Sequence, residues 1–168
     1  AGYETFGLLN ALLGRTIGGG VKGQAALFEC TELKDHPIIY DDGVYVVPHD
    51  DGICAVGSTT EKQWTDPRLP DGDRNDFIER AQMLCPPLRD ARPIRRWAGV
   101  RPRCNRTDPI IGRLNGSSNV LVATGGYKIT FGIAHRMAQC IADDICGLPE
   151  QTGVPDTFRP AHHFQEYD

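Results

Sequence analysis

The sequence predicts an α+β fold, in which a largely antiparallel sheet is followed by a strand, a tight turn and a long helix. Three patterns support it: apolar runs separated by Asp-Gly pairs over residues 37–60, two further apolar runs over residues 109–124, and helical spacing of apolar residues from Ile129 onward. A length of 168 residues with 40% hydrophobic composition is sufficient for a well-cored globular domain.

The strongest strand pattern lies between residues 37 and 60. Residues 37–40, 44–47 and 53–57 are short apolar runs, and the Asp-Gly pairs at 42–43 and 51–52 separate them. Asp-Gly supplies the positive φ angles that tight hairpin turns require. We therefore expect a three-stranded antiparallel meander, preceded by a strand over residues 24–30.

Two short helices are expected beside this sheet. Residues 6–15 carry leucines at helical spacing and form a short helix or a compact turn. A second helix begins at a cap, Asp73 or Asn75, and runs to Cys85, where two prolines end it. Its inward residues are Phe77, Ile78, Ala81 and Leu84.

The longest predicted helix runs from Ile129 to Gly147 and is amphipathic. Its acidic residues, Asp143 and Asp144, are expected on the far face. The apolar positions expected to face inward are Ile133, Ala134, Met137, Ala138, Ile141, Ala142 and Ile145. Residues 148–168 read as a polar, proline-containing tail.

Residues 94–103 form a predicted strand with an unusual charge load. Strict alternation places Arg95, Trp97 and Arg101 on one face. Residues 109–114 and 120–124 form a further hairpin, and a Gly-Gly pair at 125–126 then leads into the long helix. This strand, turn and helix bring backbone N–H groups to a helix N-terminus.

The run from Gly18 to Gly23 matches the G-x-G-x-x-G pattern, with Asp41 and Asp42 at about the distance of a ribose-binding acid. That motif requires a strand before it and a helix after it. Here a leucine-rich helical stretch precedes the glycines and a strand follows them. We therefore reject a dinucleotide site at these glycines.

Composition narrows the class of ligand. The net charge is −4 with scattered Lys and Arg, which provides no basic surface for nucleic acid, and no apolar run is long enough to span a membrane. The six cysteines form no C-x-x-C pair, so we expect buried thiols and no metal site. His162 and His163 are expected to be tail residues. A cytoplasmic protein that acts on small molecules fits these features.

Two features can carry chemistry. The Gly-Gly turn at a helix N-terminus favours an anion or a ring oxygen that gains negative charge, although a purely structural turn is equally consistent with the pattern. Arg101 stands at the end of a strand beside Pro102 and can aim a two-pronged donor at a carboxylate. A salt-bridge role for Arg101 is the alternative.

A series of short runs shares the order and spacing of one known family. They are Gly43-Val-Tyr-Val-Val-Pro48, Asp51-Gly52, Val56-Gly-Ser-Thr59 with Glu61, Trp97-Ala-Gly-Val-Arg-Pro102, Asp108-Pro-Ile-Ile-Gly112 and Val122-Ala-Thr-Gly-Gly-Tyr127. Together with the helix that follows them, these runs resemble the FAD-dependent oxidoreductases grouped with D-amino-acid oxidase, glycine oxidase and sarcosine oxidase. The resemblance extends over about residues 1–147.

The resemblance implies a domain organisation. Residues 1–19 would end an FAD-binding strand and add a connecting helix, residues 20–95 would form a substrate domain, and residues 96–147 would return to the FAD-binding domain before the tail. The opening Ala1-Gly2-Tyr3 would match the end of a family strand. A missing upstream segment would then carry the true G-x-G-x-x-G motif, so this chain, read as a fragment, is expected to retain little FAD.

The resemblance also implies site residues. Arg101 would pair with the substrate carboxylate, and Tyr45 would form a wall of the substrate pocket. The residues expected near FAD are Ala1, Gly2, Gly125, Gly126, Tyr127, Lys128, Ile129 and Thr130. His49, Asp108-Pro109 and residues 128–132 depart from the family pattern, and these departures bear on the substrate.

Two functions follow as hypotheses. In the first, the parent protein is an FAD-dependent oxidoreductase that oxidises the C–N bond of an amino acid or N-methyl amino acid, and the isolated chain is inactive. In the second, the chain is a non-catalytic domain or subunit that binds a partner flavoprotein.

Overall fold

The computed structural model describes residues 2–72, 76–117 and 119–164, which form two compact units. One unit is Val21–Val100, and the other combines Ala1–Gly20 with Arg101–Asp168. Two long strands, β1 (Gly18–Glu29) and β5 (Pro93–Cys104), each contribute residues to both units. The assignment of these units to a substrate domain and to part of an FAD-binding domain remains a prediction.

The main sheet has five strands in the order β2-β3-β4-β1-β5. As predicted, β2 (Ile39–Asp41), β3 (Val44–Pro48) and β4 (Ile53–Gly57) form an antiparallel meander. Strand β4 also pairs antiparallel with β1. The turns between the meander strands contain Gly43 and Gly52 at positive φ, as the Asp-Gly pairs require. The α+β fold with a largely antiparallel sheet is confirmed.

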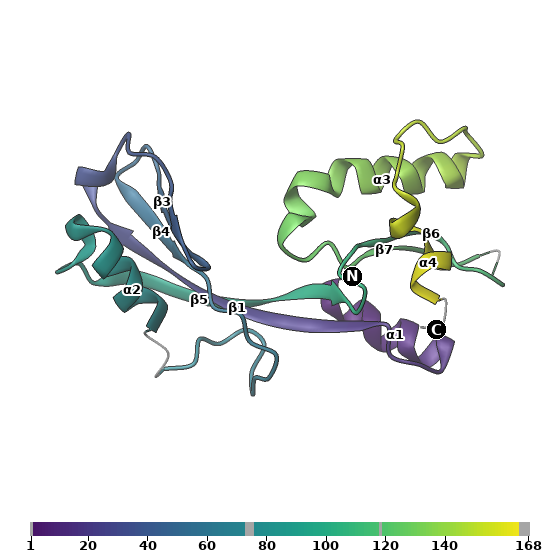
Figure 1. Cartoon of the computed structure of the whole chain (residues 1–168), viewed down its shortest axis with the longest axis horizontal. Coiled ribbons are helices and arrows are strands. Elements are labelled where there is room, and N and C mark those ends of the chain that lie inside the picture. The colour runs from purple at the N-terminus through teal and green to yellow at the C-terminus, as the bar shows by residue number, and fades with distance from the viewer. Residues whose placement is uncertain (1, 73–75, 118, 165–168) are drawn as a thin grey trace. The chain divides into compact units, whose positions relative to one another are not determined.

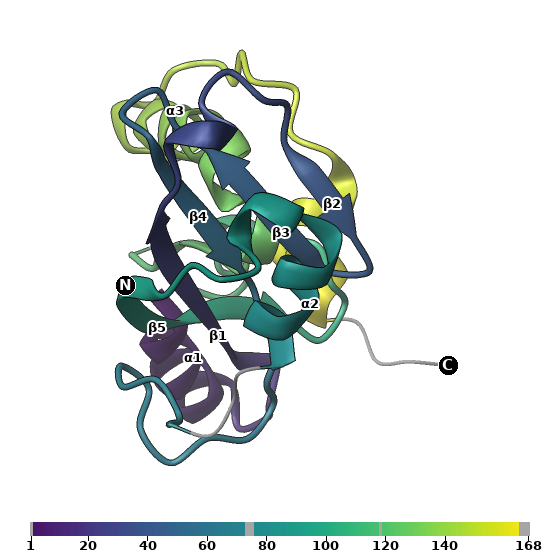
Figure 2. The same ribbon diagram turned by 90° about the vertical axis from the view of Figure 1, so that its left-hand side faces the viewer.

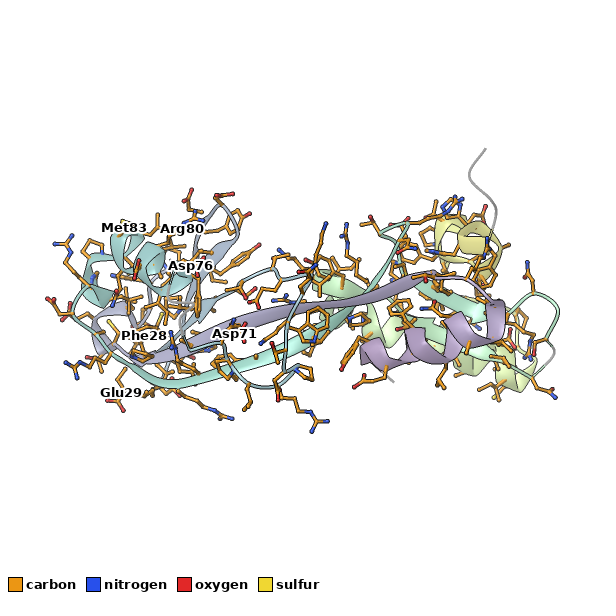
Figure 3. All side chains as sticks on the ribbon, turned by 90° about the horizontal axis from the view of Figure 1, so that it is seen from below. Phe28, Glu29, Asp71, Asp76, Arg80 and Met83 are labelled. Atoms are coloured by element: carbon orange, nitrogen blue, oxygen red, sulfur yellow. The ribbon has the colours of Figure 1, made fainter. Side chains whose placement is uncertain are left out.

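Helix α2 (Asp76–Leu84) covers strands β3 and β4 (Figure 2). It buries Phe77, Ile78 and Ala81 as predicted, whereas Leu84 is only half-buried. The core beneath it contains Phe28 of β1, labelled in Figure 3, together with side chains of β3 and β4. The predicted cap at Asp73 or Asn75 lies outside the described residues. A 3₁₀ turn, η3 (Pro86–Leu88), follows the helix, because proline cannot continue it.

The second unit is built on a small hairpin of β6 (Ile110–Arg113) and β7 (Leu121–Thr124), which confirms that prediction. Figure 1 shows α1 (Thr5–Leu13) on one side of the hairpin and α3 (Thr130–Cys146) on the other. Successive strand residues point to opposite faces. Ile110 therefore packs in the cluster of α1, and Ile111 packs in the cluster of α3. Within the described part of the chain, no helix is both long and apolar enough to cross a membrane.

The predicted inward face of α3 is partly wrong. Ile133 and Met137 do pack inward, but Ile145 is 66% exposed and the alanines at 134, 138 and 142 are exposed. The acidic residues face the protein instead, because Asp144 pairs with Arg113 of β6 and Asp143 is 3% exposed. The helix carries two apolar stripes, and the hairpin covers only the one that includes Met137.

Two further expectations need correction. Strand β1 begins at Gly18 rather than at residue 24, and a side chain at Gly18 would lie 2.2 Å from the Phe6 ring. The glycines at 18–23 thus lie within a strand, which agrees with rejecting a dinucleotide site there. Strand β5 is the edge strand of the sheet, and Cys104 is the one buried residue among its twelve, so its charged side chains stay at least partly exposed. Cys146 is exposed near the end of α3, whereas the other five thiols are buried as expected.

The C-terminal residues are not a free tail. A 3₁₀ turn, η5 (Asp156–Phe158), and α4 (Pro160–Phe164) pack against the second unit. His163 is 6% exposed, and its Nε2 lies 3.0 Å from the Pro109 carbonyl oxygen. The carbonyl can only accept, so Nε2 carries the proton and donates it. The prediction that His163 is a tail residue is therefore wrong, because its ring is buried and hydrogen-bonded to Pro109.

Acid should weaken this packing. Burial lowers the pKa of His163 below its ordinary 6.5, so the unfolded chain takes up the proton more readily than the folded one. The contribution of His163 to stability is then present above about pH 6.5 and is lost as pH falls through the folded pKa. We expect the drop in melting temperature between about pH 8 and pH 5 to be smaller in His163→Gln than in the wild type. An unchanged drop in His163→Gln would contradict this account.

Candidate functional site

The turn between β7 and α3 leaves no room for side chains at its two glycines. Gly125 has φ +81°, and a Cβ there would lie 2.1 Å from the Cys104 Sγ atom. A Cβ at Gly126 would lie 2.6 Å from the Thr130 Oγ1 atom. Gly126 also forms an isolated antiparallel bridge with Arg103 of β5. Both glycines are therefore required by close backbone approach, and the predicted strand, turn and helix is confirmed.

Tyr127 follows the glycines, and three positively charged side chains lie around its ring. Its φ is +46°, a left-handed conformation that non-glycine residues seldom adopt and that is common at functional sites. The guanidinium carbons of Arg101 and Arg103 lie 6.0 Å and 5.6 Å from the ring centroid, and the Lys128 ammonium lies 5.8 Å from it. Three cations at one ring create a region suited to an anion.

Helix α3 begins directly after this ring. A 3₁₀ turn, η4 (Tyr127–Ile129), leads into it, and the N-cap residue Ile129 provides no side-chain cap. The Thr130 hydroxyl is 3.1 Å from the Tyr127 carbonyl oxygen and donates to it, so it does not cap the helix amides either. The positive end of the helix dipole therefore adds to the charge of Lys128 and the two arginines.

Gly2 lies close to the same turn. The Thr124 hydroxyl, at the end of β7, donates to the Gly2 carbonyl oxygen at 3.2 Å, and Thr124 is 4% exposed. The structure therefore brings together Gly2 and the residues just before Gly125, which are far apart in sequence. Ala1, also expected near FAD, lies outside the described residues.

Cys104 lies behind the turn and is not a reactive thiol. Its side chain is 1% exposed, and burial raises its pKa to about 12. The thiolate is the nucleophilic form of cysteine, so Cys104 stays protonated and inert near neutral pH. Its part in the site is to fill the space against Gly125.

Tyr45, the predicted pocket wall, belongs to the Val21–Val100 unit. It lies on β3, is 43% exposed, and its ring centroid is 4.4 Å from that of Tyr40. Tyr45 is thus an accessible aromatic side chain supported by a second ring. Its role toward substrate stays a prediction.

Sequence reasoning missed Arg103. Alternation along β5 places it on the same strand face as Arg101, so the two-residue spacing was the signal that could have found it. The bridge between Arg103 and Gly126 then brings the strand to the glycine turn.

A second polar cluster was also missed, in the Val21–Val100 unit. Lys22 is fully buried, and its ammonium is 3.0 Å from the carboxylate of Asp71. Asp71 is labelled in Figure 3. The Gln24 side chain donates to the Glu61 carboxylate at 2.9 Å and accepts from the Asp71 backbone N–H at 2.9 Å. These bonds tie the loop at Asp71 to strand β1.

Removing the buried ammonium should destabilise the fold. Loss of one partner from a fully buried ion pair costs about 3–5 kcal/mol, and partial exposure of Asp71 lowers the expected cost of Lys22→Met to about 2 kcal/mol. Urea denaturation would measure this change. The exposed Lys62→Met provides a matched control that should alter stability by less than about 0.5 kcal/mol. Equal stability of the two variants would show that the buried pair contributes nothing.

Comparison with known proteins identifies relatives of the chain. The model of the FAD dependent oxidoreductase family matches residues 1–143. A glycine oxidase of Pseudomonas aeruginosa is 31% identical over 141 residues, which are 84% of this chain and 38% of the relative. A glycine oxidase of Bacillus subtilis is 28% identical, over 84% of this chain and 37% of the relative. The chain thus spans less than half the length of these relatives.

Solved structures share the fold. A glycine oxidase from Geobacillus kaustophilus superposes with a TM-score of 0.83 at 20% identity, over 98% of this chain and 45% of the other. An iminodiacetate oxidase from Chelativorans sp. BNC1 gives a TM-score of 0.83 at 24% identity, over 95% and 44% of the two chains. At these identities the superpositions establish the fold, including both the sheet and the hairpin unit.

Proposed function

Because the chain belongs to the family of FAD-dependent oxidoreductases, we propose that it is part of an enzyme that oxidises the C–N bond of an amino acid or N-methyl amino acid. The single observation that carries the proposal is the gathering of Arg101, Arg103 and Lys128 at Tyr127, directly beside the glycine turn that begins α3. This arrangement suits a carboxylate and a ring system that gains negative charge.

The residues of the turn fit a flavin. Gly125 and Gly126 pack tightly against Cys104 and Thr130, and this turn brings backbone N–H groups to the start of α3, where they can face a flavin ring. When bound, FAD supplies the redox chemistry by accepting a hydride from the substrate Cα or N-methyl carbon. The residues proposed to lie against FAD are Ala1, Gly2, Gly125, Gly126, Tyr127, Lys128, Ile129 and Thr130. Lys128 and the amides at the start of α3 would stabilise negative charge there.

Arg101 is the proposed partner of the substrate carboxylate. Its guanidinium offers two parallel N–H donors, which match the two oxygens of a carboxylate. Such a pair fixes the substrate, so that its C–N bond has one orientation. Tyr45, on β3, is the proposed aromatic wall of the pocket. The names of the relatives, glycine oxidase and iminodiacetate oxidase, favour small amino or imino acids as substrates.

The proposal extends to the parts of the protein and its location. Residues 20–95 would serve as the substrate domain, and residues 1–19 and 96–147 would contribute to an FAD-binding domain completed by a preceding segment. The length that the relatives have beyond this match supports such a segment. Five buried free thiols favour a cytoplasmic location, because thiols persist in reducing compartments.

A non-catalytic role is a second candidate that one observation favours. Phe131, in the first turn of α3, is fully exposed, and Ile129 and Ile145 are more than half exposed. Apolar stripes of this kind commonly pack against other protein surfaces. The chain would then bind a partner flavoprotein as a subunit, without oxidising an amine itself.

Anaerobic mixing with amines separates the two functions. The FAD-loaded protein that contains these residues is mixed with glycine, iminodiacetate and a primary amine that lacks a carboxylate, and the visible flavin absorbance is followed. The enzyme proposal expects bleaching by the amino acids, at least about 100-fold faster than by the simple amine, since only the former engage Arg101. Absence of bleaching by all three, with FAD bound, would support the subunit instead.

A further inference from the structure

We propose that Arg103 and Arg101 together form a paired anion site, and that the substrate carries a second anionic group in addition to its α-carboxylate. The inference rests on the proposed function and deepens it by naming the substrate class as dicarboxylic amino or imino acids. Arg103 would act as a specificity-determining residue, whereas Arg101 would serve every substrate that has an α-carboxylate.

Strand β5 directs the side chains of both arginines to the same face. They are two residues apart on β5, so their side chains leave the same face, about 6.6 Å apart at the backbone. Both guanidinium groups then reach the ring of Tyr127, at 6.0 Å and 5.6 Å. A ligand with two anionic ends can therefore meet a separate guanidinium with each end.

The Arg103 side chain has unused donor capacity. Its Nε atom is buried and has no hydrogen-bond partner. No salt bridge of the described residues involves Arg103 or Lys128, the second cation beside it. A buried, unsatisfied N–H of a charged group is costly, so a structure retains it where a ligand can supply the acceptor. Carboxylate oxygens are the natural acceptors for an arginine fork.

The ring contact alone does not account for this arrangement. A single cation over an aromatic ring already satisfies the attraction between the two, and further cations at the same ring repel the first. Lys128 and Arg103 at the same ring therefore raise an electrostatic cost that an anion would relieve. A second anionic group, beyond the α-carboxylate proposed for Arg101, would supply that anion.

Anion binding by the intact protein tests the inference without any turnover. Isothermal titration would compare acetate, with one carboxylate, and succinate, with two, for the wild type, Arg103→Gln and Arg103→Lys. Succinate should bind the wild type at least about 10-fold more tightly than acetate, since a charged hydrogen bond adds that much affinity. Arg103→Gln should lower succinate affinity about 10-fold or more and change acetate affinity less than about 2-fold, with partial recovery in Arg103→Lys.

The controls separate this inference from a structural role and from the proposed function. The exposed Arg92→Gln should leave both affinities unchanged, and melting temperatures would show whether each variant folds. Equal affinity of the wild type for succinate and acetate, or equal losses of both in Arg103→Gln, would overturn the paired site. If succinate selectivity is present but the FAD-loaded protein oxidises no amine, the paired site stands and the oxidase proposal fails.

Discussion

Replacing Arg101 with lysine should lower kcat/KM for amino-acid substrates about 100-fold in the FAD-loaded protein. Lysine keeps the positive charge but loses the planar fork, and truncating one partner of a hydrogen-bonded charge pair typically costs about 2–5 kcal/mol. Most of the loss should fall on kcat/KM rather than on the amount of bound FAD, since the substrate is the proposed partner of Arg101. Steady-state oxidation rates at several substrate concentrations measure this effect.

An amine without a carboxylate is the matched control substrate. Its oxidation should change less than about 3-fold in Arg101→Lys, because it makes no ion pair to lose. If both classes of substrate slow equally, Arg101 supports the fold rather than the carboxylate. Unchanged rates for both would remove Arg101 from the site altogether.

A side chain at Gly125 should be the most damaging small change in the hairpin unit. Gly125→Ala would place a Cβ 2.1 Å from the Cys104 Sγ atom at a φ of +81°, so overpacking and backbone strain act together. We expect a loss of about 3 kcal/mol in the free energy of unfolding and reduced FAD retention by the flavoprotein. Denaturant titration and the visible flavin spectrum measure the two effects.

The chain offers two controls for this change. Gly132→Ala, in α3 with open space around it, should be neutral or stabilise by up to about 1 kcal/mol. Adding Cys104→Ala to Gly125→Ala should recover part of the loss, because it removes the atom that the new Cβ meets. Additive losses in the double variant would contradict the steric explanation.

Local pattern was sufficient for much of the fold. The Asp-Gly pairs defined the meander because a hairpin turn needs positive φ at those positions, and Gly125-Gly126 marked the start of the long helix for a similar reason. Arg101 was identifiable from its place in a strand beside Pro102, although the strand does not end there as expected but continues to Cys104. These features depend on a few neighbouring residues, so the sequence alone contains them.

The remainder depends on contacts between distant segments. The apolar stripes of α3 are indistinguishable by periodicity, and only packing on β6 selects the one with Met137. Lys22 is buried because Asp71 and Glu61 come to strand β1 from elsewhere in the chain. Arg103 is recognisable as a site residue only from the bridge that it forms with Gly126 in the structure. Contacts with distant segments decide which of these side chains are buried, and local sequence patterns contain no information about those contacts.

We propose that these residues, in a protein of the FAD-dependent oxidoreductase family, complete a flavin site together with a preceding nucleotide-binding segment. The most direct test of this proposal is the visible absorption spectrum after mixing with FAD and gel filtration, for this chain and for the longer protein that carries such a segment. We predict that the longer protein retains flavin and that this chain alone does not. Flavin retained by neither would contradict the proposal and favour a non-catalytic subunit, and tight binding by this chain alone would contradict the part of it that requires a preceding segment.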